Sequence, residues 1–195
     1  MDCIKAGKLI LSLRKEKNMT QKEVADAMGI SDKTISKWER GLGFPDVSLL
    51  GDLSNIFDVN IEKILLGDLE PNDADGGNMT RIKFYVCTSC SNVINSTSEA
   101  EVSCCGRKLK PLIPILENVE HETNIQEIEN DYYITIEHEM TKSHFISFVA
   151  CVSYNRVLIT KLYPEQNAEL RIPKMYGGKL YFYCNQHGLW MKDKF

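Results

Sequence analysis

MTQKEVADAMGISDKTISKWERG, residues 19–41, contains two short helical segments separated by a glycine. Thr20 begins the sequence Thr-Gln-Lys-Glu, a capping box that predicts the start of a helix. Gly29 predicts the end of that helix, since glycine readily takes the left-handed conformation that follows a helix. Ser31 is a suitable N-cap for a second helix, which we expect to run to about Arg40. Two helices joined in this way make a helix-turn-helix.

The second helix of this pair has an apolar side and a basic side. Ile35 and Trp38 are expected to face the core. The opposite stripe, at spacings of three, four and seven, consists of Lys33, Ser36, Lys37 and Arg40. Such a stripe suits DNA, because Lys and Arg bind phosphates and other polar side chains read bases. A basic stripe is also what an ordinary solvated face looks like, and some domains of this fold bind proteins instead.

Amphipathic segments on both sides complete a predicted five-helix domain over residues 1–67. A first helix has apolar residues at helical spacing from Ala6 to Leu13, and a fourth opens at Pro45 and buries Leu50 and Leu53. A short fifth helix follows from Ile61.

Residues 19–41 resemble the helix-turn-helix of the Cro and phage-repressor family, often called XRE, and the resemblance covers residues 7–66. It rests on the initial Gln, the core Ala, the Gly of the turn and the Trp-Glu-Arg-Gly ending. The resemblance implies double-stranded DNA as a partner, a homodimer, and a phosphate contact from Gln21. The residues that it places at or beyond the tip of the recognition helix are Asp32, Lys33, Thr34, Ser36, Lys37 and Arg40.

Composition sets the cellular context that we expect. The chain has 195 residues, 43% of them hydrophobic, and a formal net charge of −4, so DNA contact must rely on a local basic patch. No apolar run approaches the length of a membrane span, and the first residues lack the apolar core of a secretion signal. We therefore expect a cytoplasmic protein with no membrane partner. In that reducing compartment clustered thiols point to metal.

Residues 68–80, DLEPNDADGGNMT, are acidic and rich in Gly, Asn and Asp, which is typical of a linker. A small domain, residues 81–111, is predicted to follow. It holds Cys87-x-x-Cys90, thirteen further residues, and then Cys104-Cys105. Two thiol pairs can close a tetrahedral site with no position left for a substrate. Spacing alone leaves iron, zinc and disulfides open.

This stretch resembles desulforedoxin, the small iron module at the front of desulfoferrodoxins. The adjacent Cys-Cys-Gly at 104–106 is the specific part of the likeness, whereas Ser91 stands where the family usually has Gly. The resemblance implies one iron held by the four thiolates, with zinc as the alternative.

The last region, residues 112–195, reads as short β-branched and aromatic runs between turn signals. Seven strands at this spacing predict an immunoglobulin-like β-sandwich. The predicted strands are Leu112–Leu116, Ile125–Glu129, Tyr132–His138, Phe145–Tyr154, Val157–Tyr163, Glu169–Pro173 and Lys179–Tyr183. The expected fold class is thus multidomain α + β: a five-helix domain, a four-Cys metal knuckle and a β-sandwich.

All four histidines of the chain lie in this region, near strand ends. They are His121, His138, His144 and His187, and Cys184 lies three residues before the last of them. Neutral imidazole together with thiolate suits iron, zinc or copper.

HEMTKSHFISFV at 138–149, together with YCNQHGLW at 183–190, resembles the catalytic domain of superoxide reductases, the neelaredoxin and desulfoferrodoxin family. The resemblance implies a second iron with four equatorial histidines and Cys184 as the axial ligand. One face of such an iron is open to superoxide or peroxide. Two departures concern reactivity: Val119-Glu120 replaces the family's Glu-Lys, and Glu139 replaces a proline. A carboxylate at Glu120 would repel an anion from the open face.

Three functions are consistent with this reading. The first is a DNA-binding transcription regulator that senses redox state, superoxide or peroxide at its iron. The second is a superoxide reductase that carries a DNA-binding domain, with no residue beyond the metal ligands firmly assigned to catalysis. The third is an ordinary repressor whose C-terminal half is a zinc-stabilised dimerisation platform.

Overall fold

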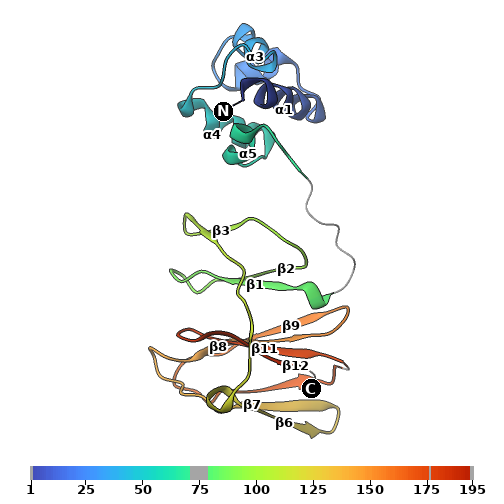
Figure 1. Ribbon diagram of the computed structural model, residues 1–195, viewed down its shortest axis with the longest axis vertical. Coiled ribbons are helices and arrows are strands. Elements are labelled where there is room, and N and C mark those ends of the chain that lie inside the picture. Colours follow the sequence, from blue (N-terminus) through green and yellow to red (C-terminus); the bar gives the residue numbers. More distant parts are fainter. Residues whose placement is uncertain (1, 71–78, 176, 194–195) are drawn as a thin grey trace. The chain divides into compact units, whose positions relative to one another are not determined.

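The computed structural model describes residues 2–70, 79–175 and 177–193 (Figure 1). It divides into two compact units, Met1–Pro71 and Asn72–Phe195. The predicted linker at 68–80 falls largely outside the described residues.

The N-terminal unit contains the five predicted helices. They are α1 (Cys3–Glu16), α2 (Gln21–Ala27), α3 (Asp32–Glu39), α4 (Leu50–Phe57) and α5 (Ile61–Leu66), with a 3-10 turn at Val47–Leu49. The capping box is present, because Thr20 Oγ1 accepts the backbone N–H of Glu23 and the Glu23 carboxylate accepts that of Thr20. Gly29 has a φ of +65° just after α2. In the part of the chain that is described, no helix has the length and apolar character needed to span a membrane.

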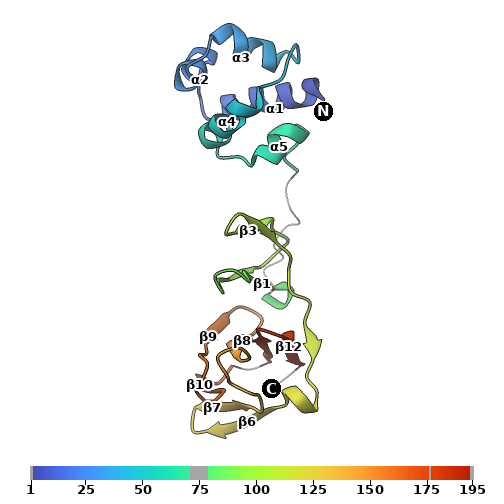
Figure 2. The same cartoon turned by 90° about the vertical axis from the view of Figure 1, so that its left-hand side faces the viewer.

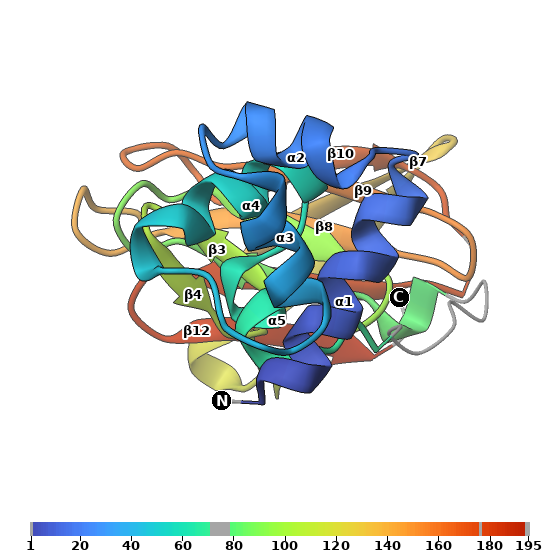
Figure 3. The ribbon, with the colours of Figure 1, turned by 90° about the horizontal axis from the view of Figure 1, so that it is seen from above.

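The core of this unit lies between all five helices. Fully buried aliphatic side chains come from each of them: Ile10, Val24, Ile35, Leu53 and Ile64. Helix α3 contacts both α1 and α2 (Figure 3). This packing leaves the opposite side of α3 in solvent, where Lys33, Lys37 and Arg40 are exposed.

The C-terminal unit is built on two sheets that face each other (Figure 1). One has the strand order β10-β7-β6 and the other β5-β12-β11-β8-β9. Their strands are β5 (Ile115–Leu116), β6 (Thr123–Ile128), β7 (Asp131–Ile136), β8 (Ile146–Val152), β9 (Val157–Lys161), β10 (Glu169–Pro173), β11 (Lys179–Cys184) and β12 (Gly188–Asp193). Buried side chains such as Ile134, Ile172, Leu180 and Phe182 fill the space between the sheets. The predicted α + β fold class is confirmed.

The sequence prediction differs from this structure by one strand. The described residues after 112 form eight strands, whereas seven were expected, and the additional strand is β12. It pairs antiparallel with β11 from Lys179↔Asp193 to Cys184↔Gly188. Burial along β12 does not alternate with period two, so its sequence lacks the usual strand pattern.

Two small hairpins precede the sandwich: β1 (Lys83–Val86) with β2 (Val93–Ser96), and β3 (Val102–Cys104) with β4 (Arg107–Leu109). The first hairpin covers the outer face of the five-stranded sheet. The ring of Phe84 lies 5.7 Å from that of Phe148 and 5.4 Å from that of Tyr181, centroid to centroid. Strand β8 is therefore buried along its whole length, on both faces.

Candidate functional site

The basic stripe on α3 borders a shallow hollow at the surface of the N-terminal unit. Of the seven residues predicted to contact DNA, six line this hollow: Gln21, Asp32, Lys33, Ser36, Lys37 and Arg40. Thr34 does not, because its hydroxyl lies 2.9 Å from that of the N-cap Ser31. The predicted surface is thus one continuous patch built from α3 and the first residue of α2.

A buried ion pair below this patch was not anticipated from the sequence. Arg14 donates from Nε and Nη2 to the two carboxylate oxygens of Glu39, at 2.5 and 3.0 Å. The same carboxylate accepts a hydrogen bond from Gln21 Nε2 at 2.7 Å, and Arg14 also donates to the Met19 carbonyl. Glu39 thus ties α1, α2 and α3 together and fixes the predicted phosphate-binding Gln21. Glu39 belongs to the Trp-Glu-Arg-Gly ending, but no local sequence pattern predicts that it pairs with Arg14, 25 residues earlier.

The four knuckle cysteines form a compact cluster. The Sγ atoms of Cys87, Cys90, Cys104 and Cys105 lie within 4.8 Å of one another. Those of Cys90 and Cys104 are 3.5 Å apart, well beyond the roughly 2.05 Å of a disulfide. Sulfurs bound tetrahedrally at about 2.3 Å would lie about 3.8 Å apart. The donor set and its spacing therefore fit a single metal ion.

Hydrogen bonds and neighbouring thiols in the knuckle shift the pKa values of its cysteines in opposite directions. Hydrogen bonds from the backbone N–H groups of Ser89 and Cys90 lower the pKa of Cys87 to about 6. The neighbouring thiols, Cys90 first, raise the pKa of Cys105 to about 12. All four cysteines can be thiolates at the same time only if a cation is bound between them. Ser91 has a φ of +55°, the left-handed conformation for which glycine is favoured, so the substitution for the family's Gly keeps the turn.

The second cluster forms at one end of the sandwich. One donor atom each from His121, His138, Cys184 and His187 lies within 4.8 Å of the others. Nδ1 of His187 is 3.0 Å from Nε2 of His121. Two nitrogens bound at about 2.1 Å to one ion, at right angles, would also lie about 3 Å apart. The spacing of these two rings therefore fits neighbouring ligands of one metal.

His144 lies beside this group, although it is not among the four closest donors. Its ring centroid is 4.5 Å from that of His138 and 4.7 Å from that of His187. Its Nδ1 lies 3.0 Å from the carboxylate of Glu139, and Nδ1 of His138 faces the carbonyl oxygen of the same residue. Since these oxygens only accept, both Nδ1 atoms donate, which leaves the two Nε2 atoms as the candidate metal-binding atoms. Both Nε2 atoms are buried, with no hydrogen-bond partner among the described residues.

Packing and hydrogen bonds hold the ligand-type side chains in place. The ring of His121, only 2% exposed, stacks on Trp190 at 4.1 Å between centroids and 11° between planes. Cys184 ends β11, and its sulfur accepts the backbone N–H groups of Gln186 and His187, both at 3.4 Å. Hydrogen bonds of this kind tune the electron density on a ligand sulfur. Burial also lowers the pKa of His138, which favours the neutral imidazole that binds metals.

Asn185 clamps two ligand-bearing loops together, a role that the sequence did not reveal. Its Oδ1 accepts the backbone N–H of Phe145 at 2.9 Å, and its Nδ2 donates to the Ser143 carbonyl at 3.0 Å. Gln186 Nε2 donates to the same carbonyl. These bonds fix the loop around His144 against the loop of Cys184.

We expect Asn185→Ala to weaken metal binding at the second cluster by about 10–100-fold, because partners that orient ligands have effects of this size. Competition with a chelator, followed through the visible spectrum, measures the change. Asn124→Ala on β6 is the matched control, since Asn124 is exposed. Equal affinities of the two variants would contradict the clamp.

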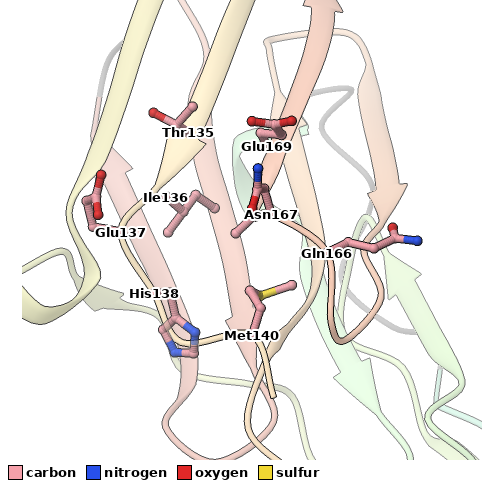
Figure 4. A pocket seen from close by; sticks show the side chains of 9 residues that line it. Thr135, Ile136, Glu137, His138, Met140, Gln166, Asn167 and Glu169 are labelled. Atoms are coloured by element: carbon pink, nitrogen blue, oxygen red, sulfur yellow. The ribbon is translucent and has the colours of Figure 1, made fainter. Parts of the chain in front are cut away.

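A pocket of 410 Å³ opens next to His138, between the ends of β7 and β10 (Figure 4). His138 and Met140 lie at one end of it, and Thr135 and Glu169 at the other. Among the described residues that line it there is no Lys or Arg, but there are two carboxylates, Glu137 and Glu169. The pocket side of His138 is therefore acidic. Val119 is exposed, whereas the side chain of Glu120 lies outside what the structure describes.

Comparison with known proteins agrees with the two-part architecture. Residues 10–64 match the family model for helix-turn-helix proteins, and residues 104–193 match the model for desulfoferrodoxin. A desulfoferrodoxin of Clostridium acetobutylicum is 37% identical over 59 residues, 30% of this chain and 47% of that protein. The HTH-type transcriptional activator BcrR of Enterococcus faecalis is 37% identical over 71 residues, 36% of this chain and 35% of that protein. The chain thus spans less than half the length of these two relatives.

One solved structure supports the fold of the C-terminal unit. The superoxide reductase from Treponema pallidum superimposes with a TM-score of 0.50 at 16% identity, covering 57% of this chain and 98% of that one. The chain therefore joins a region similar to helix-turn-helix proteins, residues 10–64, to a region similar to desulfoferrodoxins, residues 104–193.

Proposed function

We propose that this protein is a transcription regulator that binds double-stranded DNA as a homodimer and senses oxidation, superoxide or peroxide at an iron centre in its desulfoferrodoxin domain. The observation that carries the proposal is the gathering of His121, His138, Cys184 and His187 in the same chain as a basic recognition helix.

The DNA-binding half of the proposal rests on α3. Its exposed cations, Lys33, Lys37 and Arg40, lie beside Gln21 on one patch. Because the whole chain is acidic, this local patch must supply the phosphate affinity. Ser36 and Asp32 offer polar groups that can read base edges.

We expect Lys37→Ala to weaken binding to all DNA duplexes alike, and to reduce the slope of log affinity against log salt by about one. Lys8→Ala is the matched control, since Lys8 is an exposed lysine on α1 that does not line the α3 hollow. Fluorescence anisotropy at several salt concentrations measures both effects. An unchanged slope for Lys37→Ala would place the DNA elsewhere.

The iron-binding half rests on the two clusters. Cys87, Cys90, Cys104 and Cys105 would hold one metal ion, iron or zinc, in a site with no open position. His121, His138, His144 and His187, with Cys184, would hold a second iron. When bound there, that iron would supply one-electron redox chemistry. The chain's own residues orient the ligands, lower the pKa of His138 through burial and donate hydrogen bonds to the Cys184 sulfur.

The electrostatics near His138 favour a sensor over a fast enzyme. The pocket beside His138 carries the carboxylates of Glu137 and Glu169 and no cation among its described lining residues. The sequence also places Val119-Glu120 directly before His121. Negative charge lowers the rate at which an anion such as superoxide arrives.

The test is DNA affinity in two redox states. A duplex selected from a random pool by the full-length protein is titrated with anaerobic ferrous protein and with oxidised protein. We expect at least about a tenfold difference in Kd, which corresponds to a coupling of typical allosteric size. Cys184→Ser should abolish the difference. Equal affinities in both states would refute the sensor.

The retained set of four histidines and one cysteine also favours a second candidate, a superoxide reductase. Ferrous iron held there would supply the one electron that, with two protons, converts superoxide to hydrogen peroxide. Superoxide consumption by ferrous protein, compared with metal-free protein, decides the matter. Consumption no faster than in the metal-free control removes this candidate.

A further inference from the structure

The connection from the knuckle to the sandwich exposes an unusual amount of apolar surface. Four aliphatic side chains within seven residues are exposed: Ile113 by 83%, Ile115 by 50%, Leu116 by 64% and Val119 by 87%. Large aliphatic side chains exposed together in this way mark interaction sites in soluble proteins.

These side chains lie on the open edge of a sheet. Strand β5 pairs with β12 through Trp190↔Ile115 and Met191↔Leu116, and it ends the strand order of its sheet. In Figure 2 this yellow-green segment runs along the outside of the unit, next to β12. Within the part of the chain that the structure describes, β5 has a strand on one side only. An exposed apolar edge strand is a template for association.

Two prolines limit what kind of association is possible. Pro111 and Pro114 have no backbone N–H, so no long ladder of hydrogen bonds can form along this edge. Contact must come mainly from side chains. That favours one closed contact over the indefinite pairing of strands seen in fibres.

Charge at the two ends of the segment fits a second copy of the same segment. Arg107 and Lys110 are exposed before the apolar stretch, and Glu122 is exposed after it. A two-fold axis through β5 would place the basic end of each copy beside the acidic end of the other. Such complementarity fixes the direction of association.

We infer that the β5 edge, with Ile113, Ile115, Leu116 and Val119, is the surface through which two copies of this chain form a dimer. The apolar centre supplies the stability of the contact, and the charged ends supply its direction. Cys105 of the cysteine cluster precedes this segment in the chain, and His121 of the histidine cluster follows it. This position along the chain would let a change at either cluster alter the dimer contact, which rests on the proposed function.

Sedimentation equilibrium of the full metal-loaded chain tests this inference. We expect a dimer for the unmodified chain and about a hundredfold weaker dimerisation for Leu116→Glu, since the axis brings two like charges together. Ile113→Glu should act in the same way, and it changes a side chain outside any strand. Leu158→Glu is the matched control on β9, the opposite edge of the same sheet, and should remain dimeric.

Exchanging the charges at the two ends of the segment tests whether its partner is a second copy of the chain. Lys110→Glu should weaken the dimer, and the double variant Lys110→Glu/Glu122→Lys should recover most of the loss. A monomeric wild type at all concentrations, or Leu116→Glu and Ile113→Glu dimers as tight as the control, would overturn the inference. Failure of the proposed function appears differently, as equal DNA affinity in both redox states while Leu116→Glu still dissociates the dimer.

Discussion

Glu39→Ala is expected to lower the free energy of unfolding of the N-terminal unit by about 3–5 kcal/mol, because it leaves the buried Arg14 guanidinium without its partner. It also removes the hydrogen bond that fixes Gln21. Urea unfolding of the full chain, followed by circular dichroism at the helix band, measures the loss, since the long helices lie in this unit. Glu16→Ala, an exposed site on α1, should change stability by no more than about 0.5 kcal/mol.

The same ion pair predicts the pH dependence of this unit. Burial alone would raise the pKa of Glu39, but hydrogen bonds from Arg14 and Gln21 outweigh burial and hold the pKa below its ordinary 4.5. A carboxyl whose pKa is depressed in the folded state stabilises the fold above its unfolded pKa. That contribution disappears as the pH falls below 4.5 and through the folded-state value. Glu39→Gln should lack this acid-dependent step, and a step retained in that variant would assign it to other groups.

Cys184→Ser is expected to remove the iron proposed for the histidine cluster and to weaken metal binding there by about a hundredfold or more. Loss of an outer partner alone typically costs 10–100-fold, and here a proposed direct ligand is lost. The thiolate-to-iron absorption band of the histidine cluster should disappear, while the metal of the four-Cys knuckle should remain. Metal analysis and visible spectra of anaerobically purified protein measure these changes.

Cys151→Ser is the matched control for Cys184→Ser. Cys151 is another buried cysteine of the same sheet, on β8, and it belongs to neither cluster. Both variants lose one buried thiol, so only a role in metal binding separates them. If both variants kept the metal content and the spectrum of the unmodified chain, the proposed second centre would be ruled out.

The helical unit was predictable because its signals are local. The capping box at Thr20, the N-cap at Ser31 and the glycine after α2 each act within a few residues, and each appears in the structure. The cysteine and histidine positions were also predictable, since family motifs fix them along the chain. The structure places four of the cysteines in one cluster and three of the histidines with Cys184 in another.

What could not be predicted depends on contacts between distant residues. Glu39 and Arg14 each look like ordinary polar residues of amphipathic helices until α1 and α3 pack together. Asn185 acts through Phe145 and Ser143, some 40 residues earlier. Strand β12 is stabilised by its full register with β11 rather than by an alternating pattern of its own.

The outer face of the five-stranded sheet has a practical consequence for dissecting this protein. Phe148 and Tyr181 are covered by Phe84 of the β1–β2 hairpin, so that hairpin completes a second hydrophobic core. A fragment that began at residue 112 would place these aromatic rings in water and would tend to aggregate. Fragments should therefore be divided at the boundary of the compact units, Pro71 and Asn72. The cysteine knuckle and the sandwich belong to one compact unit, which a gene fusion or deletion should move as a whole.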